Sequence, residues 1–435
     1  MKVLFLCGGV GKRMYPMTEE KYLLKFLGNT LLEHQMRLAL EVGLRDFILV
    51  SSPQNVERVR QIAAGVRGTK SQIAVQEQSL GIANAVQSAA KLLDGEFIIA
   101  NPDDLIEKAA YTSLLADRAR TQADACLLGY RVKDYFPGGY LVVNEGGELT
   151  HIVEKPGKGK EPSDLVNVLV HLHADPKLLL DHISHVQSDR DDVYERALDA
   201  MCRDKHRIRV VPYTGIWHAI KYPWHVFEAV RFFMDRAEGQ VSPQAKVSSL
   251  ATLDGKVIVE EGARIHEYAV VRGPAYIGKG TVIGNSTLVR GYSHIGADCV
   301  VGFATEIKGA YIADGCWFHM NYVGDSVVGE RCNFGAGTIT ANWRFDEQPV
   351  CVKIGDAMMN TGLEKLGAFI GNGCRTGVNV TIMPGVRIGP NAIIAPATCV
   401  TRDVEADAMV VGHSSARPLR RSAGGKRVDE SRGEG

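Results

Sequence analysis

Apolar residues recur in the first half of the chain as short runs that alternate with longer amphipathic stretches. Runs such as VLFLC, DFILV, EFIIA and RIRVVPY are typical of strands. Residues 31–42 and 109–120 have the apolar spacing of helices. Strands that alternate with helices predict an α/β layer structure with a largely parallel sheet. We expect a Rossmann-like α/β domain over residues 1–226 and one amphipathic linker helix over 227–240.

The second half follows a repeat of six residues. β-branched residues recur in strict phase from Val259 to Ile307, and a second series from Ile370 to Val400 has its phase shifted by three. Such hexapeptide repeats predict a left-handed parallel β-helix, because an ordinary sheet domain would not keep a six-residue period. We expect it over residues 241–405, followed by a flexible basic tail over 406–435. β-helices of this kind usually assemble in threes, so we expect a homotrimer.

Between the two series the repeat fails. Ala313 and His319 stand where the period places a core aliphatic residue. A break in a solenoid indicates an insertion or a loop, and loops beside a rigid scaffold often carry sites. Two interpretations of His319 are open: a histidine accommodated in a distorted coil, or a functional residue.

Charge and cysteine usage exclude several classes of function. Fifty acidic and fifty basic residues cancel, so no bulk field attracts nucleic acid or an anionic membrane. The nine cysteines are scattered without paired metal-ligand spacing, and no apolar stretch reaches the length of a membrane span. We therefore expect a soluble cytoplasmic protein that binds neither nucleic acid nor membrane.

A glycine-rich turn follows the first apolar run. In CGGVGKRM the backbone N–H groups are placed to meet a phosphate. The third glycine of a dinucleotide fingerprint is missing, and Lys12 precedes Arg13 where a P-loop needs Ser or Thr. Arg13 and the nearby Lys21 would suit a nucleoside triphosphate. The alternative is a structural turn with solvated cations.

Three basic residues in the β-helix are spaced by eighteen. Arg272, Arg290 and Lys308 each follow an inward aliphatic, and three hexapeptides make one coil. These side chains should therefore stack on one outer edge, where like charges repel. A bound phosphate would turn that repulsion into attraction. A solvated column is the alternative.

The N-terminal motifs carry a resemblance to a known family. CGGVGKRMYPMT, QEQSLGIANAV, ANPDD, VEKP and VNVLV resemble the successive motifs of the sugar-1-phosphate nucleotidylyltransferases. The resemblance implies that Arg13 and Lys21 are catalytic, with the triphosphate of UTP or dTTP between them, and that Asp103 binds Mg²⁺. It further implies nucleotide contacts from Gly8, Gly9, Gly11, Gln76 and Gly81, and sugar contacts from Gly139, Glu154, Lys155 and Asn167. The alternative for Asp103 is a strand-end turn without metal.

One departure from this pattern concerns the metal. In WHAIKYPW, Ala219 stands where related archaeal-type enzymes have a second metal-binding aspartate. Alanine cannot ligate a cation, and the neighbouring His218 and His225 are poor Mg²⁺ ligands. Ala219 therefore weakens the expectation of full nucleotidylyl transfer.

The C-terminal motifs carry a second resemblance. ATEIKGAY, FHMNYVGD and NFGAGTITANW are similar to the acetyltransferase domain of the bifunctional N-acetylglucosamine-1-phosphate uridylyltransferase/glucosamine-1-phosphate N-acetyltransferase family. The resemblance implies that His319 is the catalytic base and that Arg290 and Lys308 bind the sugar phosphate. It also implies sugar contacts from Tyr322 and Asn333 and acetyl-CoA contacts from Ala336 and Asn342.

The sequence therefore predicts a bifunctional enzyme. We expect acetyl-CoA-dependent N-acetylation of an amino-sugar 1-phosphate on the β-helix, and Mg²⁺-dependent nucleotidylyl transfer on the first domain. Glucosamine or galactosamine, and UTP or dTTP, remain open. The alternatives are an enzyme with one of the two activities, or a noncatalytic regulatory or scaffolding trimer.

Overall fold

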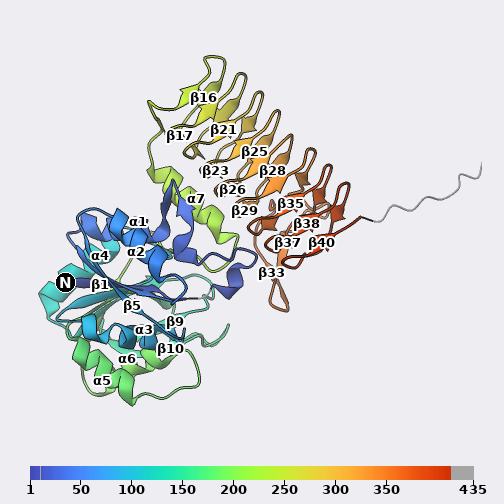
Figure 1. Cartoon of the computed structure of the whole chain (residues 1–435). Helices are drawn as coiled ribbons and strands as arrows, with labels where there is room; N and C mark the ends of the chain where they lie inside the picture. The colour runs from blue at the N-terminus through green and yellow to red at the C-terminus, as the bar shows by residue number, and fades with distance from the viewer. Residues whose placement is uncertain (10, 413–435) are drawn as a thin grey trace, which may run out of the picture.

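The computed structural model describes residues 1–9 and 11–412. An α/β domain and a long solenoid lie side by side, with helix α7 (His225–Arg236) between them (Figure 1). No helix in the described part of the chain is both long enough and apolar enough to cross a membrane.

The first domain is built on a mixed sheet of nine strands. Its central strands are parallel in the order β6-β1-β4-β5, but β11 pairs antiparallel with both β6 and β8. The expectation of a largely parallel sheet is therefore wrong for the part of the sheet around β11, where the strand pairs are antiparallel. The strands are β1 (Lys2–Cys7), β4 (Asp46–Ser51), β5 (Lys70–Val75), β6 (Phe97–Ala100), β8 (Ala125–Arg131), β9 (Gly139–Val143), β10 (Leu149–Glu154), β11 (Leu165–His173) and β12 (Ile208–Pro212).

Helices cover both faces of this sheet, as the apolar pattern predicts. The expected helix at 31–42 is α1, which begins at a capping box between Thr30 and Glu33, and the expected helix at 109–120 is α4. The helices before α7 are α1 (Leu31–Glu41), α2 (Val56–Gly65), α3 (Gly81–Ser88), α4 (Ala109–Thr121), α5 (Pro176–His185) and α6 (Val193–Arg203).

The solenoid consists of three stacked parallel sheets, as the hexapeptide repeat predicts. The first runs from β14 (Gln240–Val241) to β37 (Arg387–Ile388), the second from β15 (Lys246–Val247) to β40 (Met409–Val410), and the third from β16 (Thr252–Asp254) to β39 (Cys399–Val400). The aliphatics of both series, from Val259 to Ile307 and from Ile370 to Val400, are buried in its core. Because β40 still pairs with β38 (Ile393–Ile394), the coil continues past the expected end at 405. Residues 413–435 of the expected tail lie outside the described residues.

The break in the repeat has a different cause from the one expected. Three of the four core steps from Ile307 to Val328 are each one residue short, namely Ile307 to Ile312, Phe318 to Val323 and Val323 to Val328. Ile312 and Phe318 are buried in place of Ala313 and His319, and His319 is exposed. The expectation of a core position for His319 is therefore wrong. The three missing residues also account for the phase shift of three.

An insertion leaves the solenoid after β31 (Ile339–Thr340). It contains the antiparallel hairpin of β32 (Cys351–Ile354) and β33 (Ala357–Asn360), which projects from the side of the coil (Figure 1). The chain returns at β34 (Phe369–Ile370), which pairs directly with β29 (Val327–Val328). The insertion therefore adds a wall beside the coil without changing its core.

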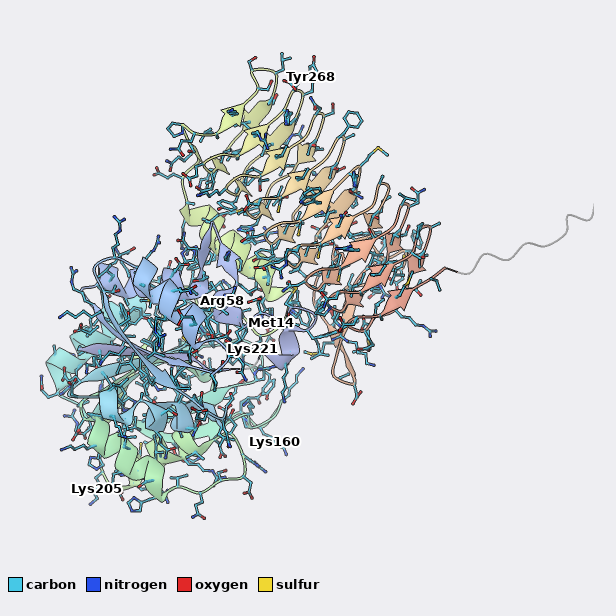
Figure 2. All side chains as sticks on the ribbon, viewed as in Figure 1. Met14, Arg58, Lys160, Lys205, Lys221 and Tyr268 are labelled. Carbon is cyan, nitrogen blue, oxygen red and sulfur yellow. The ribbon has the colours of Figure 1, made fainter. Side chains whose placement is uncertain are left out.

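The two domains share an apolar junction. Tyr276, His294 and Tyr311 stack along the first sheet of the solenoid, with ring centroids 4.7 and 4.9 Å apart. Phe26 lies 5.5 Å from the Tyr311 ring, and the Leu27 N–H donates to His294 Nε2 at 3.2 Å. Figure 2 shows Met14 and Lys221 where the first domain meets the solenoid. The glycine-rich loop is thus continued by a segment that packs on the β-helix.

Candidate functional site

Six of the predicted nucleotide-site residues gather in one cavity of about 470 Å³ at the carboxyl ends of β1 and β6. Strands of a parallel sheet place their following loops at the same edge, which is why residues far apart in sequence meet here. The predicted residues that line the cavity are Gly8, Gly9, Lys21, Gln76, Gly81 and Asp103. Lys12, Ser79, Asn101 and Asp191 line it as well, and the sequence reading did not single them out as site residues.

Two glycines of this cavity are required by its geometry. A Cβ at Gly8 would overlap the side-chain oxygen of Gln76, whose Nε2 donates to the Gly81 carbonyl at 3.1 Å. Gly81 begins α3 with a φ of +87°, and a Cβ there would overlap the Asp191 carboxylate. A side chain at either position would therefore displace Gln76 or Asp191.

The two cations predicted to bind the triphosphate, Lys21 and Arg13, have different surroundings. Lys21 forms an ion pair with Asp103 inside the cavity. Arg13 lies on the 3-10 turn Lys12–Met14, where its guanidinium is 5.7 Å from the Tyr222 ring centroid. Gly11 lies beside the Lys21 side chain, and Lys12, rather than Arg13, lines the cavity.

The neighbouring carboxyls Asp103 and Asp104 differ in their surroundings. Asp103 reaches the cavity, whereas Asp104 accepts a hydrogen bond from Trp217 Nε1 at 3.2 Å. Burial, together with the charge of Asp103, raises the pKa of Asp104 to about 7. Ala219 pairs directly with Asp104 in the short antiparallel pair of β7 (Asp104–Leu105) and β13 (His218–Ala219).

This donor set fits Mg²⁺ only together with a phosphate ligand. No cluster of three or more acidic, histidine or cysteine side chains within residues 1–9 and 11–412 is placed to hold a metal. Mg²⁺ is commonly held by one or two carboxylates plus substrate phosphates. Of the two carboxylates that line the cavity, Asp103 and Asp191, Asp103 is the predicted metal ligand and could take that role.

The predicted sugar residues form a group of their own. Gly139 pairs with Glu154 in the sheet, and a Cβ added to Gly139 would stand 3.1 Å from Glu154 Oε2 and 3.5 Å from Asn167 Cβ, so these three residues are neighbours. Lys155 Nζ is 2.7 Å from Glu154 Oε1. The structure therefore brings together all four predicted sugar residues.

A buried relay stands behind Asn167. His171 Nε2 is 2.6 Å from Asn167 Oδ1, His171 Nδ1 is 2.7 Å from the Tyr194 hydroxyl, and His173 Nε2 is 2.8 Å from the same hydroxyl. Burial lowers the pKa of both histidines, that of His173 to about 3, so both rings are neutral. An amide oxygen only accepts, so His171 Nε2 carries the proton and Nδ1 accepts from Tyr194. The Asn167 NH₂ is thereby left for a ligand.

Lys221 is a buried lysine close to the charges of Asp104 and Glu154, although it does not line the nucleotide cavity. Its Nζ donates to the Pro137 carbonyl at 2.8 Å and lies 3.5 Å from the Phe136 ring centroid. Burial lowers the pKa of Lys221 to about 7. The Phe136 ring and the charge of Asp104 come close to Lys221 only after folding, so no signal in the sequence identified this lysine.

A second cavity of about 420 Å³ lies at the edge of the solenoid, under α7. Arg290 and Lys308 line it and follow core residues that pair in register, on β22 (Leu288–Val289) and β25 (Glu306–Lys308). Arg272 follows Val271 in the same register, so the predicted column is present. Arg290 is 3.0 Å from Glu306, and Lys308 pairs with Asp325.

Tyr322 and Asn342 are joined to this cavity by hydrogen bonds. Asn342 Nδ2 donates to the Tyr322 hydroxyl at 3.0 Å and also to Asp325, the partner of Lys308. Asp325 is therefore the centre of the network. It was not among the predicted residues, although it closes the motif FHMNYVGD.

Three predicted residues lie elsewhere on the same coils. His319 is at the corner between β27 (Trp317–Phe318) and β28 (Tyr322–Gly324), whereas Lys308 pairs with Gly324 at the other end of β28. The His319 backbone N–H donates to Asn321 Oδ1 at 2.7 Å, and its side chain is exposed. Asn333, on β30 (Asn333–Phe334), is exposed beside Trp317, and Ala336 accepts from the Asn379 N–H at 2.8 Å in the next turn.

Family models match both halves of the chain. Residues 2–218 match the family model of nucleotidyl transferases, and residues 256–291 and 367–402 match that of the bacterial transferase hexapeptide (six repeats). A solved UDP-glucose pyrophosphorylase complexed with UDP-glucose matches 54% of this chain and 99% of its own at 18% identity and a TM-score of 0.47.

Two relatives match nearly the whole chain. A bifunctional sugar-1-phosphate nucleotidylyltransferase/acetyltransferase of Sulfurisphaera tokodaii is 33% identical over 93% of this chain and 98% of its own. A bifunctional protein GlmU of Methanococcus maripaludis is 36% identical over 94% of this chain and 97% of its own. The chain therefore belongs to the family of bifunctional sugar-1-phosphate nucleotidylyltransferases/acetyltransferases.

Proposed function

We propose that this protein N-acetylates an amino-sugar 1-phosphate with acetyl-CoA on its β-helix and couples the N-acetylated sugar phosphate to a nucleotide on its α/β domain. The observation that carries the proposal is that six predicted residues share one cavity of the α/β domain, while Arg290 and Lys308 share another at the edge of the solenoid. Glucosamine 1-phosphate is the first candidate substrate, and galactosamine 1-phosphate is the second.

In the α/β domain the nucleotide is UTP or dTTP. The sugar-phosphate oxygen attacks the α-phosphorus in line, and pyrophosphate leaves. Lys21 and Lys12 line the cavity and would neutralise the triphosphate; Arg13 reaches it only if its turn swings inward. Asp103 would hold Mg²⁺ with phosphate oxygens, and the ion would neutralise charge on them. Gly139, Glu154 and Asn167 would orient the sugar.

On the β-helix the sugar would lie along the outer face of β28. Arg290 and Lys308 would hold its phosphate, and Tyr322 would lie under the ring. The imidazole of His319 takes a proton from the 2-amine as its nitrogen attacks the thioester carbonyl. The C–N bond forms, the C–S bond breaks, and CoA leaves as a thiolate. Asn333, Asn342 and the backbone near Ala336 are the candidate contacts of acetyl-CoA and of the oxyanion.

We also propose that three chains assemble through the solenoid. Exposed apolar side chains gather along the corner that carries His319: Tyr268, Phe303, Trp317, Met320 and Val378 are each at least half exposed. Figure 2 shows Tyr268 projecting at the far end of the coil. An apolar band of this kind on a monomer marks an interaction surface. Analytical ultracentrifugation should find a trimer that Phe303→Lys weakens.

Measurement of both activities in the full-length protein tests the proposal. CoA release is followed with acetyl-CoA and either glucosamine or galactosamine 1-phosphate, and pyrophosphate release with UTP and dTTP offered in parallel. Both signals are expected. If the protein releases CoA but no pyrophosphate, it is an acetyltransferase with a single activity. This is the second candidate function, and Ala219 favours it because alanine supplies no metal ligand. Absence of both signals would contradict the proposal and favour a scaffold.

A further inference from the structure

The cavity around Arg290 and Lys308 has walls from three parts of the chain. Residues of α7 form one side, the edge of the solenoid forms the floor, and the end of the insertion forms the other side. The residues of α7 and its start that line it are Trp224, His225, Phe227, Glu228, Val230 and Arg231. The linker helix α7 therefore forms part of a site that the sequence motifs assign to the β-helix.

Two further cations line this cavity, and aromatic rings hold both of them. The Arg231 guanidinium lies 4.4 Å from the Tyr292 ring centroid, and the Tyr292 hydroxyl is fixed by a 2.8 Å hydrogen bond to Asp235. Lys365 Nζ lies 5.4 Å from the Trp343 ring centroid. A cation over an aromatic face is held in place while its N–H donors stay free for another ligand.

The charges of the lining residues leave an excess of positive charge. Arg231, Arg290, Lys308 and Lys365 face only two carboxylates in the lining, Glu228 and Asp325. Lys308 is paired with Asp325, and Glu228 lies 3.6 Å from His218. Within residues 1–9 and 11–412, neither Arg231 nor Lys365 is within ion-pair distance of a carboxylate. Two positive charges thus remain to be neutralised by a ligand.

We propose that Arg231 and Lys365 bind the phosphate monoester of the sugar substrate together with Arg290 and Lys308. Helix α7 therefore completes the acetyl-transfer site, and this inference rests on the proposed function. A phosphate monoester carries close to two negative charges at neutral pH and accepts several hydrogen bonds. The cavity volume of about 420 Å³ is in the range of pockets for small ligands. The 3′-phosphate of CoA is chemically equivalent, so the test separates the two sources.

The test uses Arg231→Gln and Lys365→Gln in the full-length protein, with Arg236→Gln as the matched control. Arg236 is on the same helix, over Phe232 and paired with Glu107, and does not line the cavity. The readouts are the KM for glucosamine 1-phosphate and for acetyl-CoA in CoA release, and the Kd of glucosamine 1-phosphate by calorimetry. Thermal midpoints confirm that all variants fold.

Each cavity variant should raise the KM for glucosamine 1-phosphate roughly ten-fold or more, since a hydrogen bond to a charged group contributes about 1.5–3 kcal/mol. The kcat, the KM for acetyl-CoA and pyrophosphate release should match the control. An increase in the KM for acetyl-CoA that is absent when acetyl-dephospho-CoA is the donor would overturn the assignment to the sugar. Variants that equal Arg236→Gln, while Arg290→Gln loses affinity, would overturn the inference and leave the proposed function intact. A wild-type chain that binds no sugar phosphate would overturn both.

Discussion

Ala219 lies directly opposite Asp104 in the antiparallel pair of β13 and β7, one residue from the carboxylate that reaches the nucleotide cavity. A side chain with oxygen ligands at position 219 would thus stand opposite Asp104, the neighbour of Asp103 in the chain. The chain has a methyl group there instead, so position 219 adds no carboxylate to Asp103 and Asp191, which line the nucleotide cavity.

Ala219→Asp should strengthen the response of nucleotidylyl transfer to Mg²⁺. The added carboxylate supplies another hard oxygen ligand, so the Mg²⁺ concentration that gives half-maximal pyrophosphate release should fall several-fold. Without Mg²⁺ the new charge repels Asp103 and Asp104, and the thermal midpoint should drop. Ala219→Asn is the control of similar size. An unchanged Mg²⁺ dependence would contradict the placement of the metal at Asp103.

His319→Ala should abolish CoA release from acetyl-CoA and glucosamine 1-phosphate. The amine must lose a proton to attack, and an imidazole is the proposed acceptor. UTP-dependent pyrophosphate release should be unchanged, because His319 is on the solenoid. CoA release at the wild-type rate would remove His319 from the mechanism.

The shifted register predicts that substitutions of the neighbours Phe318 and His319 change the free energy of unfolding by very different amounts. Phe318 is 2% exposed in the core, so Phe318→Ala should lower the free energy of unfolding by about 3–5 kcal/mol. His319→Ala should change it by less than about 0.5 kcal/mol, because the side chain is exposed. Chemical denaturation of both variants checks this. Equal losses of unfolding free energy in the two variants would contradict the shortened core steps that bury Phe318 and expose His319.

Tyr194→Phe should weaken sugar binding by the α/β domain without loss of fold. It removes the hydroxyl that fixes the His171 tautomer, and through it the amide of Asn167. With about 1 kcal/mol lost, the KM for the N-acetylated sugar 1-phosphate should rise roughly five-fold at a similar kcat. Tyr111→Phe is the control, since its buried hydroxyl has no hydrogen-bond partner among the described residues. If both variants behave alike, the relay does not position Asn167.

Glu195 should make stability fall as the pH rises. Burial, together with the charge of Glu154, raises the pKa of Glu195 to about 8 from an ordinary value near 4.5. The folded state therefore holds an extra proton between these values, and the free energy of unfolding decreases there by at most about 1.4 kcal/mol per pH unit. Glu195→Gln should flatten that decline in denaturation curves at pH 5 and pH 8. A slope equal to that of the wild type would show that Glu195 is ionised when folded.

The sequence by itself determined the class of both domains, because the signals are local. Each hexapeptide contributes one inward aliphatic residue, and each strand and helix has its own apolar period. The glycine loop and the motifs around Asp103, Asn167 and His319 likewise identified the family that the relatives confirm.

Only the tertiary structure decided which residues share a site. The positions of the three short core steps depend on which strands pair, so Phe318 and His319 exchanged their expected places. Lys12 replaced Arg13 in the cavity because Arg13 turns toward Tyr222. Arg231 and Lys365 are far apart in sequence and meet only because α7 and the insertion pack on the same edge of the solenoid. Such proximity arises from the docking of separate elements, which no local period in the chain encodes.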